Sequence, residues 1–257
     1  FPHPLVTAIT NVGWDHQQFL GSTIREIAAE KAGIIKVGVP VVVGRMRPEA
    51  LSVIHEHAMR NVAEVYDAQL EEDAHAINRV QVENRGTARS ICHLINQLPD
   101  WEISTRAIDE GLRIYPQLTG QRGRFEWLPS TANGARVLAD CAHNLDGLVA
   151  LNAELNRLPY DQLHVVFGTV ADKLLDPLWA ILPKGNYYWC AADIPRAKAP
   201  SELALEAQLR GVMGVTFERV EEALKAAMAA ANPKDLILVT GSIFTVAEAL
   251  PSERFIP

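Results

Sequence analysis

The stretch AITNVGWDHQQFLGSTIREIAAEKAGIIK, residues 8–36, decides the fold of the first part of this chain. Residues 5–10 are apolar and β-branched, which is typical of a strand buried on both faces. Further along, Thr23 followed by Glu26 predicts a capping box at the start of a helix that ends near Gly33 and carries Lys31 in its last turn. A strand, a loop and a helix in this order indicate an α/β fold.

The same alternation continues on both sides of this stretch. Residues 39–44 are predicted to form a second strand and residues 48–61 a second helix, since Pro48 suits a first helical turn. Residues 66–80 read as a loop, and two helices are expected over residues 81–97 and 103–113. A domain boundary near residue 117 gives two domains, 1–116 and 117–257.

The second domain alternates more regularly. Strands are predicted at residues 137–140, 164–168, 187–192, 215–217 and 236–240, separated by helical stretches such as 201–210 and 220–231. This order predicts a mostly parallel, Rossmann-like sheet with helices on both faces. Ligands of such sheets bind at the carboxyl ends of the strands, and polar residues follow the predicted strands at those ends: Asp15-His16, Asp140 to Asn144, Asp172-Lys173 and Gly241-Ser242.

Composition narrows the class of protein. The 257 residues carry a net charge of -7 without a Lys/Arg run, so no nucleic-acid partner is expected. There is no uncharged apolar run of about 18 residues, so no membrane span is expected. The three cysteines are far apart and lack CxxC spacing, which argues against disulfides and zinc and favours a cytoplasmic location. Because the chain begins with Phe1, we expect a piece of a longer protein.

Each polar candidate has a structural explanation when it is taken alone. Asp140 and Ser242 could cap helices, and Lys31 could stabilise a helix C-terminus through the helix dipole. Arg124 and Lys173 could be solvated surface cations. Only the joint pattern favours a functional site.

That joint pattern resembles the folylpolyglutamate synthase and dihydrofolate synthase family, within the wider Mur ligase group. The resemblance rests on segments that keep the order and spacing of the family over nearly the whole chain: TNVGWDH, EKAGIIK, QVEN, GRFEW, DCAHN, FGTVADK and TGSIFTVAEAL. It implies the end of a Mur-type ATPase domain over residues 1–116 and a glutamate-binding domain over residues 117–257. The implied activity is an ATP-dependent amide ligase that uses Mg²⁺ and adds L-glutamate to a folate or dihydropteroate carboxylate through an acyl phosphate.

The resemblance also assigns roles to particular residues. Lys31 is similar to a family lysine that is carbamylated, and His16 to a histidine that binds Mg²⁺; both are implied to be catalytic. The nucleotide is implied to contact Asn84, Arg124 and Asp140, and the incoming glutamate His143, Lys173 and Ser242. We expect Lys31 and His16 to approach one another, and the three glutamate residues to share one pocket near Asp140.

One departure from the family pattern is large. The Gly-Lys-Ser phosphate loop of the family is absent, and the chain contains no Gly-Lys dipeptide at all. We therefore expect the carboxyl-terminal part of a synthase that is inactive by itself. Two alternatives stay open: a fragment of a Mur-type peptidoglycan ligase, although EKAGIIK favours the folate branch, and a non-catalytic binding module that keeps the ligase fold. The sequence does not determine the oligomeric state.

Overall fold

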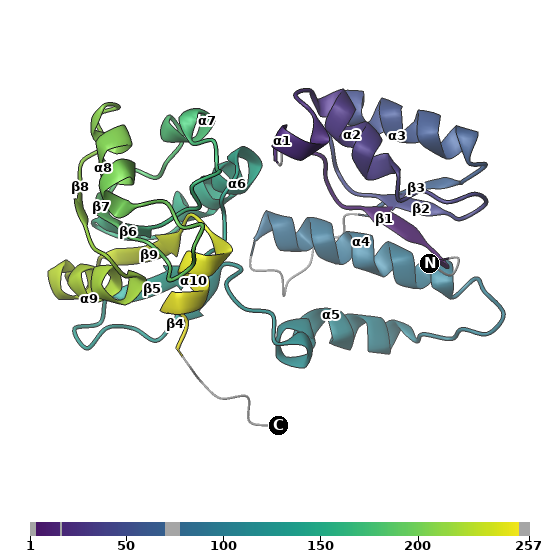
Figure 1. Ribbon diagram of the computed structural model, residues 1–257. Coiled ribbons are helices and arrows are strands. Elements are labelled where there is room, and N and C mark those ends of the chain that lie inside the picture. The colour runs from purple at the N-terminus through teal and green to yellow at the C-terminus, as the bar shows by residue number, and fades with distance from the viewer. Residues whose placement is uncertain (1–3, 16, 70–77, 252–257) are drawn as a thin grey trace. The chain divides into compact units, whose positions relative to one another are not determined.

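The computed structural model describes residues 4–15, 17–69 and 78–251. The chain divides into two compact units between Gly120 and Gln121 (Figure 1). The first unit has a parallel sheet, the second has a mostly parallel sheet, and each has its own hydrophobic core.

The first unit is built on three short parallel strands in the order β1 (Thr7–Ile9), β2 (Val41–Val43) and β3 (Val65–Asp67). Helices α2 (Ile24–Ala32) and α3 (Pro48–Arg60) pack together and share a core with one face of β1 and β2. Helix α4 (Arg79–Ile95) contacts β2 and lies on the opposite side of the sheet, with α5 (Thr105–Thr119) beyond it (Figure 1). A short helix, α1 (Gln17–Leu20), precedes α2.

The predicted start of α2 is confirmed. The amide of Glu26 donates to Thr23 Oγ1 at 3.1 Å, and Glu26 Oε2 accepts from the amide of Thr23 at 3.0 Å. These two bonds form the capping box that satisfies amide groups of the first turn. Lys31 lies in the last turn, as predicted.

Two boundaries in the first unit differ from the predictions. The predicted loop at residues 66–80 contains most of β3, because a three-residue edge strand is too short to show periodicity in the sequence. The predicted helix 103–113 continues to Thr119, where Gly120 adopts a left-handed φ of 65°. The expected boundary near residue 117 therefore falls inside α5, since the helix ends at the glycine cap.

The second unit contains a six-stranded sheet in the order β4-β5-β9-β6-β7-β8. Five strands run parallel: β5 (Arg136–Ala139), β9 (Leu236–Thr240), β6 (Leu163–Phe167), β7 (Asn186–Trp189) and β8 (Gly214–Thr216). Strand β4 (Glu126–Leu128) was not predicted and pairs antiparallel with β5. The predicted mostly parallel α/β sheet is confirmed, with this antiparallel strand at one edge.

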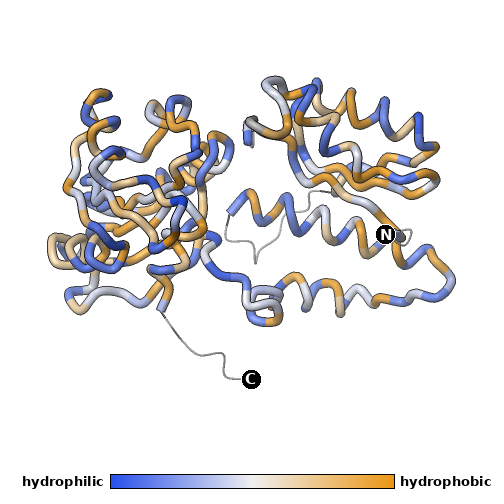
Figure 2. Tube along the Cα trace, viewed as in Figure 1, coloured by the Kyte–Doolittle hydropathy of each residue, from blue (hydrophilic) through white to orange (hydrophobic). Residues whose placement is uncertain are grey.

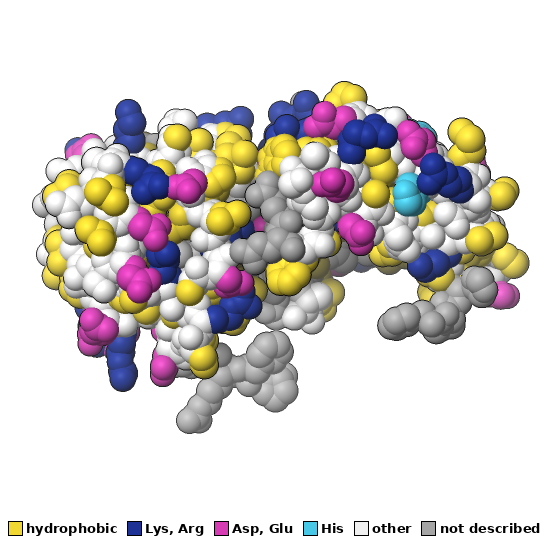
Figure 3. Space-filling view, turned by 45° about the horizontal axis from the view of Figure 1, so that its top comes forward, with side chains coloured by type: hydrophobic (Ala, Val, Ile, Leu, Met, Phe, Trp, Pro, Cys, Tyr) yellow, Lys and Arg dark blue, Asp and Glu magenta, His cyan; other side chains and the backbone are white. Residues whose placement is uncertain are grey.

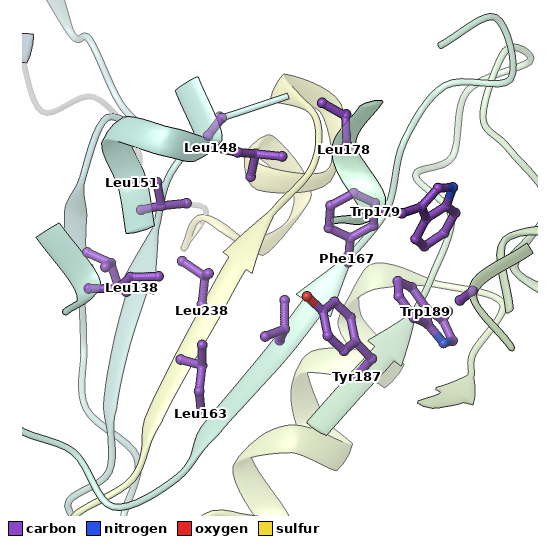
Figure 4. Close-up of a cluster of buried hydrophobic side chains, with 14 of the residues drawn as sticks. Leu138, Leu148, Leu151, Leu163, Phe167, Leu178, Trp179, Tyr187, Trp189 and Leu238 are labelled. Atoms are coloured by element: carbon purple, nitrogen blue, oxygen red, sulfur yellow. The ribbon is translucent and has the colours of Figure 1, made fainter. Parts of the chain in front are cut away.

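Alternating residues of the central strands face two separate cores. Helices α6 (Leu145–Leu155), α7 (Asp176–Trp179) and α8 (Pro200–Gln208) cover one face, and α9 (Val220–Ala230) and α10 (Ile243–Ala249) cover the other. Figure 4 shows the first core, where Phe167, Trp189 and Leu238 point toward the α6 and α7 side chains. Neighbouring Val166 and Val239 face the second core. Because both of its faces are buried, the central strand β9 is apolar from Leu236 to Val239. Helix α3, which has one exposed side, instead alternates hydrophilic and hydrophobic residues along its length (Figure 2).

A buried polar cluster lies at the amino-terminal edge of this sheet. His164 of β6 contacts Tyr188 Oη at 3.0 Å through Nδ1 and Asp235 Oδ2 at 3.3 Å through Nε2. The amide of Asn232 also donates to Asp235 at 2.7 Å, and that of Gln162 at 3.1 Å. These bonds, led by the one from the Asn232 backbone, hold the pKa of Asp235 below its ordinary value.

The first prediction concerns Asp235. Asp235→Asn should lower the free energy of unfolding by about 1–3 kcal/mol at neutral pH, because an amide cannot accept every bond that the buried carboxylate accepts. The depressed pKa of the folded state makes this contribution fully present above the ordinary carboxyl pKa and lost as the pH falls through the folded value.

Urea unfolding at pH 7 and near pH 3 measures the effect of Asp235→Asn. The difference between the variant and the parent protein should narrow at the lower pH. Asp161→Asn, at an exposed aspartate of the same sheet edge, is the matched control and should change little. A difference for Asp235→Asn that stays constant over this pH range would contradict the prediction.

Candidate functional site

The loops that follow β5, β9 and β6 meet at the carboxyl-terminal edge of the second sheet. The carbonyl of Ala142, after β5, accepts from the amide of Gly241 at 3.2 Å and from Thr240 Oγ1 at 3.2 Å. In turn the amide of Gly168, after β6, donates to the Thr240 carbonyl at 3.4 Å. Backbone contacts between adjacent strands therefore gather three loops at one edge, where ligands of parallel sheets bind.

Two glycines allow this close approach. A Cβ at Gly241 would lie 2.5 Å from the carbonyl oxygen of Gly168, and the φ of Gly241 is +103°. A Cβ at Gly168 would lie 2.6 Å from Thr245 Oγ1. A side chain at either position would push the loops apart.

Asp140, directly after β5, accepts hydrogen bonds from two loops at this edge. Its Oδ2 accepts from the amide of Phe125 at 2.8 Å, and its Oδ1 accepts from the amide of Ala142 at 2.9 Å. Phe125 is buried with a left-handed φ of 50°, a conformation that non-glycine residues rarely adopt. One carboxylate therefore connects the GRF loop to the DCAHN loop.

The pKa of Asp140 is raised above its ordinary value. Desolvation by burial is the main cause, and it outweighs the two backbone hydrogen bonds and the nearby charges of Arg124 and His143, which act in the opposite direction. Arg124 itself is exposed. The structure thus places the predicted nucleotide residues Arg124 and Asp140 beside one another and shows a loop-organising function for Asp140.

His143 and Ser242 lie at the amino ends of two helices. The Nδ1 atom of His143 is 2.8 Å from the carbonyl of Cys141, and because a carbonyl oxygen only accepts, Nδ1 carries a proton and donates this bond. Ser242 Oγ accepts from the amide of Thr245 at 3.0 Å and lies 2.8 Å from Thr245 Oγ1. Ser242 is 6% exposed and forms the N-cap of α10. Its hydrogen bonds therefore show a capping function.

Lys173 is half-buried in the loop after β6. Its amide donates to the carbonyl of Val170 at 3.2 Å, which closes a turn. The preceding residue, Asp172, accepts two bonds from Arg196 Nη2 at 2.8 and 3.0 Å. The three residues predicted to bind glutamate thus belong to loops that meet at the same sheet edge, while their joint action on a ligand stays a prediction.

In the first unit, Lys31 lies close to the loop that follows β1. Its Nζ donates to the carbonyl of Asn11 at 3.0 Å. His16 lies outside the described residues, so the predicted approach of Lys31 to His16 stays a prediction. Asn84 is exposed on α4.

The predictions from sequence missed several residues of the second-unit edge: Arg196, Phe125, Thr240 and Thr245. Arg196 follows the end of a predicted strand, and this position in the sequence is the signal that could have marked it as a site residue. The bonds of Phe125 and Thr240 depend on tertiary contacts with Asp140 and Ala142, whereas Thr245 makes a local bond to the Ser242 N-cap three residues earlier.

Two further observations concern metals and membranes. Among the residues that the structure describes, no group of three or more His, Cys, Asp or Glu side chains is placed to hold a metal ion. Within the same residues, no helix is long and apolar enough to cross a membrane. On the face shown in Figure 3, described charges of both signs are interspersed among hydrophobic side chains.

Comparison with known proteins defines the class of the second unit. Residues 123–243 match the sequence model of the Mur ligase family described as "Mur ligase, glutamate ligase domain". The six-stranded, mostly parallel sheet and the loops at its carboxyl-terminal edge lie within this match. The second unit is therefore a glutamate ligase domain of the Mur ligase type.

Longer matches place the whole chain. It is 33% identical to a probable bifunctional folylpolyglutamate synthase/dihydropteroate synthase of Haloferax volcanii, over 96% of this chain and 32% of that protein. It superposes with a TM-score of 0.76 and 27% identity on E. coli FolC in complex with DHPP and ADP, covering 95% of this chain and 60% of that one. It also superposes on a bifunctional folylpolyglutamate synthase/dihydrofolate synthase with Mn, AMPPNP and L-glutamate bound. The TM-score is 0.76 and the identity 27%, and the match covers 95% of this chain and 61% of that one.

The second unit thus belongs to the Mur ligase family, and nearly the whole chain is similar to folylpolyglutamate synthases and dihydrofolate synthases. The chain spans about a third of the Haloferax protein and about 60% of the two solved synthases.

The second prediction concerns Gly241. Gly241→Ala should destabilise the protein by about 1–3 kcal/mol more than Gly211→Ala, because only the first introduces a steric clash. Gly211 also has a positive φ, of 76°, but no atom lies within 4 Å of a Cβ built there. Thermal unfolding of both variants measures the difference, and equal losses would show that strain in φ, without the contact to Gly168, explains the glycine.

Proposed function

We propose that this chain forms part of an ATP-dependent ligase that joins L-glutamate to the carboxylate of a folate or of dihydropteroate. The observation that supports it most is the meeting of the β5, β6 and β9 loops, which carry His143, Lys173 and Ser242, at one edge of a glutamate ligase domain. A family member of the same fold has been solved with L-glutamate bound.

The chemistry of glutamate fits these side chains. An amino acid with two carboxylates needs at least one cation, and the Lys173 ammonium can meet a carboxylate as a point charge. His143 keeps its proton on Nδ1 through the Cys141 carbonyl, so its Nε2 can accept a hydrogen bond from the amino group of glutamate. The ammonium group of glutamate can attack only after it has lost a proton, which frees its lone pair. The neutral imidazole of His143 would be a suitable acceptor for that proton.

ATP and Mg²⁺ are the proposed cofactors. ATP would activate the acceptor carboxylate as an acyl phosphate. Asn84, Arg124 and Asp140 are proposed to face the nucleotide, with the exposed Arg124 as a cation for its phosphates. Lys31 and His16 are proposed to act in catalysis, His16 as a Mg²⁺ ligand. The described residues contain no metal-binding cluster of three or more His, Cys, Asp or Glu side chains, so the Mg²⁺ assignment rests on the resemblance alone.

One ligation assay distinguishes the proposed function from its two alternatives. Expression of the gene from its own initiation codon gives the protein for a ligation assay with ATP, Mg²⁺, labelled L-glutamate and either tetrahydrofolate or dihydropteroate. Glutamylation of a pterin acceptor supports the proposal. Label transfer only to a muramoyl-peptide precursor would favour the peptidoglycan ligase, and binding of glutamate without any transfer would favour the non-catalytic module.

The third prediction concerns the protein of these 257 residues. It should not turn over ATP, because the chain contains no Gly-Lys dipeptide, and phosphoryl transfer depends on a phosphate loop for positioning and charge neutralisation. Glutamate-dependent release of ADP is the measurement. Release above that of a His16→Ala control would contradict the prediction.

The fourth prediction concerns Lys173. Lys173→Ala should weaken L-glutamate binding about tenfold or more, the effect of losing one charged hydrogen bond, and should leave nucleotide binding nearly unchanged. Titration of the labelled amino acid followed by NMR gives the affinity. Lys184→Ala, at an exposed lysine near the opposite end of β7, is the matched control, and equal losses for glutamate and nucleotide would contradict the assignment.

A further inference from the structure

A short antiparallel bridge braces the loop that carries Lys173. The amide of Ala171 donates to the Arg196 carbonyl at 2.8 Å, and the amide of Lys198 donates to the Thr169 carbonyl at 2.9 Å. These bonds pair Val170 with Ala197 outside the named strands. The loop after β6 is therefore attached to the segment that follows β7.

Side chains strengthen both sides of this bridge. Arg196 Nη2 reaches both carboxylate oxygens of Asp172, at 2.8 and 3.0 Å. Lys198 Nζ lies 2.6 Å from Glu206 Oε1, and the Lys198 side chain is only 11% exposed, so the supporting segment is itself held against α8. Asp172 is thus tied to a segment that is anchored in the fold.

Global stability does not account for the Arg196–Asp172 pair. The two side chains are 57% and 49% exposed, and exposed ion pairs contribute little to the free energy of unfolding. The pair does hold the pKa of Asp172 below its ordinary value, mainly through the hydrogen bond from Arg196, so Asp172 keeps its charge. Its effect is local, on the residue immediately before Lys173.

We propose that Arg196 is a positioning residue that acts through Asp172 to fix the loop carrying Lys173, so that the lysine is presented to a carboxylate of the incoming amino acid. This inference rests on the proposed function. The amide of Lys173 is already tied to Val170, so a fixed Asp172 leaves the 170–173 turn little freedom. Ordering the loop before binding removes an entropy cost from binding.

The main competing explanation is that Arg196 contacts the amino acid directly. The two explanations predict different results for Asp172→Asn. If Arg196 acts through Asp172, loss of either partner has the same effect, and the double variant is no worse than the single ones. If Arg196 contacts the ligand directly, loss of Asp172 releases its guanidinium and leaves binding equal or stronger.

The first measurement is hydrogen exchange of the peptide that covers residues 169–174 in the 257-residue protein. Arg196→Ala keeps the backbone carbonyl that bonds to Ala171 but removes the ion pair, and should accelerate exchange about three- to tenfold without changing the unfolding midpoint. Lys225→Ala breaks another exposed ion pair, with Glu221 on α9, and should leave this peptide unchanged. Unchanged exchange in Arg196→Ala would overturn the proposal.

The second measurement is the affinity for L-glutamate by NMR titration. Arg196→Ala and Asp172→Asn should each weaken binding about three- to tenfold, their combination no further, and Arg196→Lys should recover only part, since lysine lacks the planar fork. Tighter or unchanged binding in Asp172→Asn, or additive losses in the double variant, would overturn the positioning function. No glutamate binding by the unsubstituted protein, with exchange still faster in Arg196→Ala, would count against the proposed function and not against the brace.

Discussion

The carboxylate of Asp140 is the contact on which the edge of the second sheet depends. It accepts from amides on two loops, at Phe125 and at Ala142, and the carbonyl of the same Ala142 receives the bonds from Thr240 and Gly241. One side chain thus links the GRF loop, the DCAHN turn and the loop after β9. It also keeps Phe125 in a left-handed conformation, which needs such support.

Two carboxyl groups at opposite ends of the sheet have pKa values shifted in opposite directions. At the amino-terminal edge, Asp235 is enclosed by hydrogen-bond donors that lower its pKa, led by the Asn232 amide, so its ionised form stabilises the fold. At the carboxyl-terminal edge, desolvation of Asp140 outweighs its two backbone bonds, and its pKa is raised. Groups with pKa values raised by desolvation are common where a protein binds or transforms a ligand. This agrees with the meeting of the loops after β5, β6 and β9 at the same edge.

Much of the framework could be predicted from the sequence because its signals are local. The capping box of Thr23 and Glu26 and the apolar run of β9 each depend on residues close together in the chain. Strand β4 could not be predicted in this way, since its three residues follow the left-handed Phe125 and pair only through β5. Strand β3 was missed for the same reason of length.

In the site, too, the sequence indicates which residues follow a strand but not which contacts they make. His143 and Ser242 could be selected because each follows a predictable strand, yet their hydrogen bonds show helix-end positions that the strand pattern alone does not determine. Arg196 lies 23 residues after Lys173 in the chain and is joined to its loop by the antiparallel bridge and the ion pair with Asp172. A pattern of strand ends selects the loops that meet at an edge, whereas bonds between those loops determine how each side chain is held there. The way in which Lys173 is held at this edge therefore depends on contacts between loops that no single motif encodes.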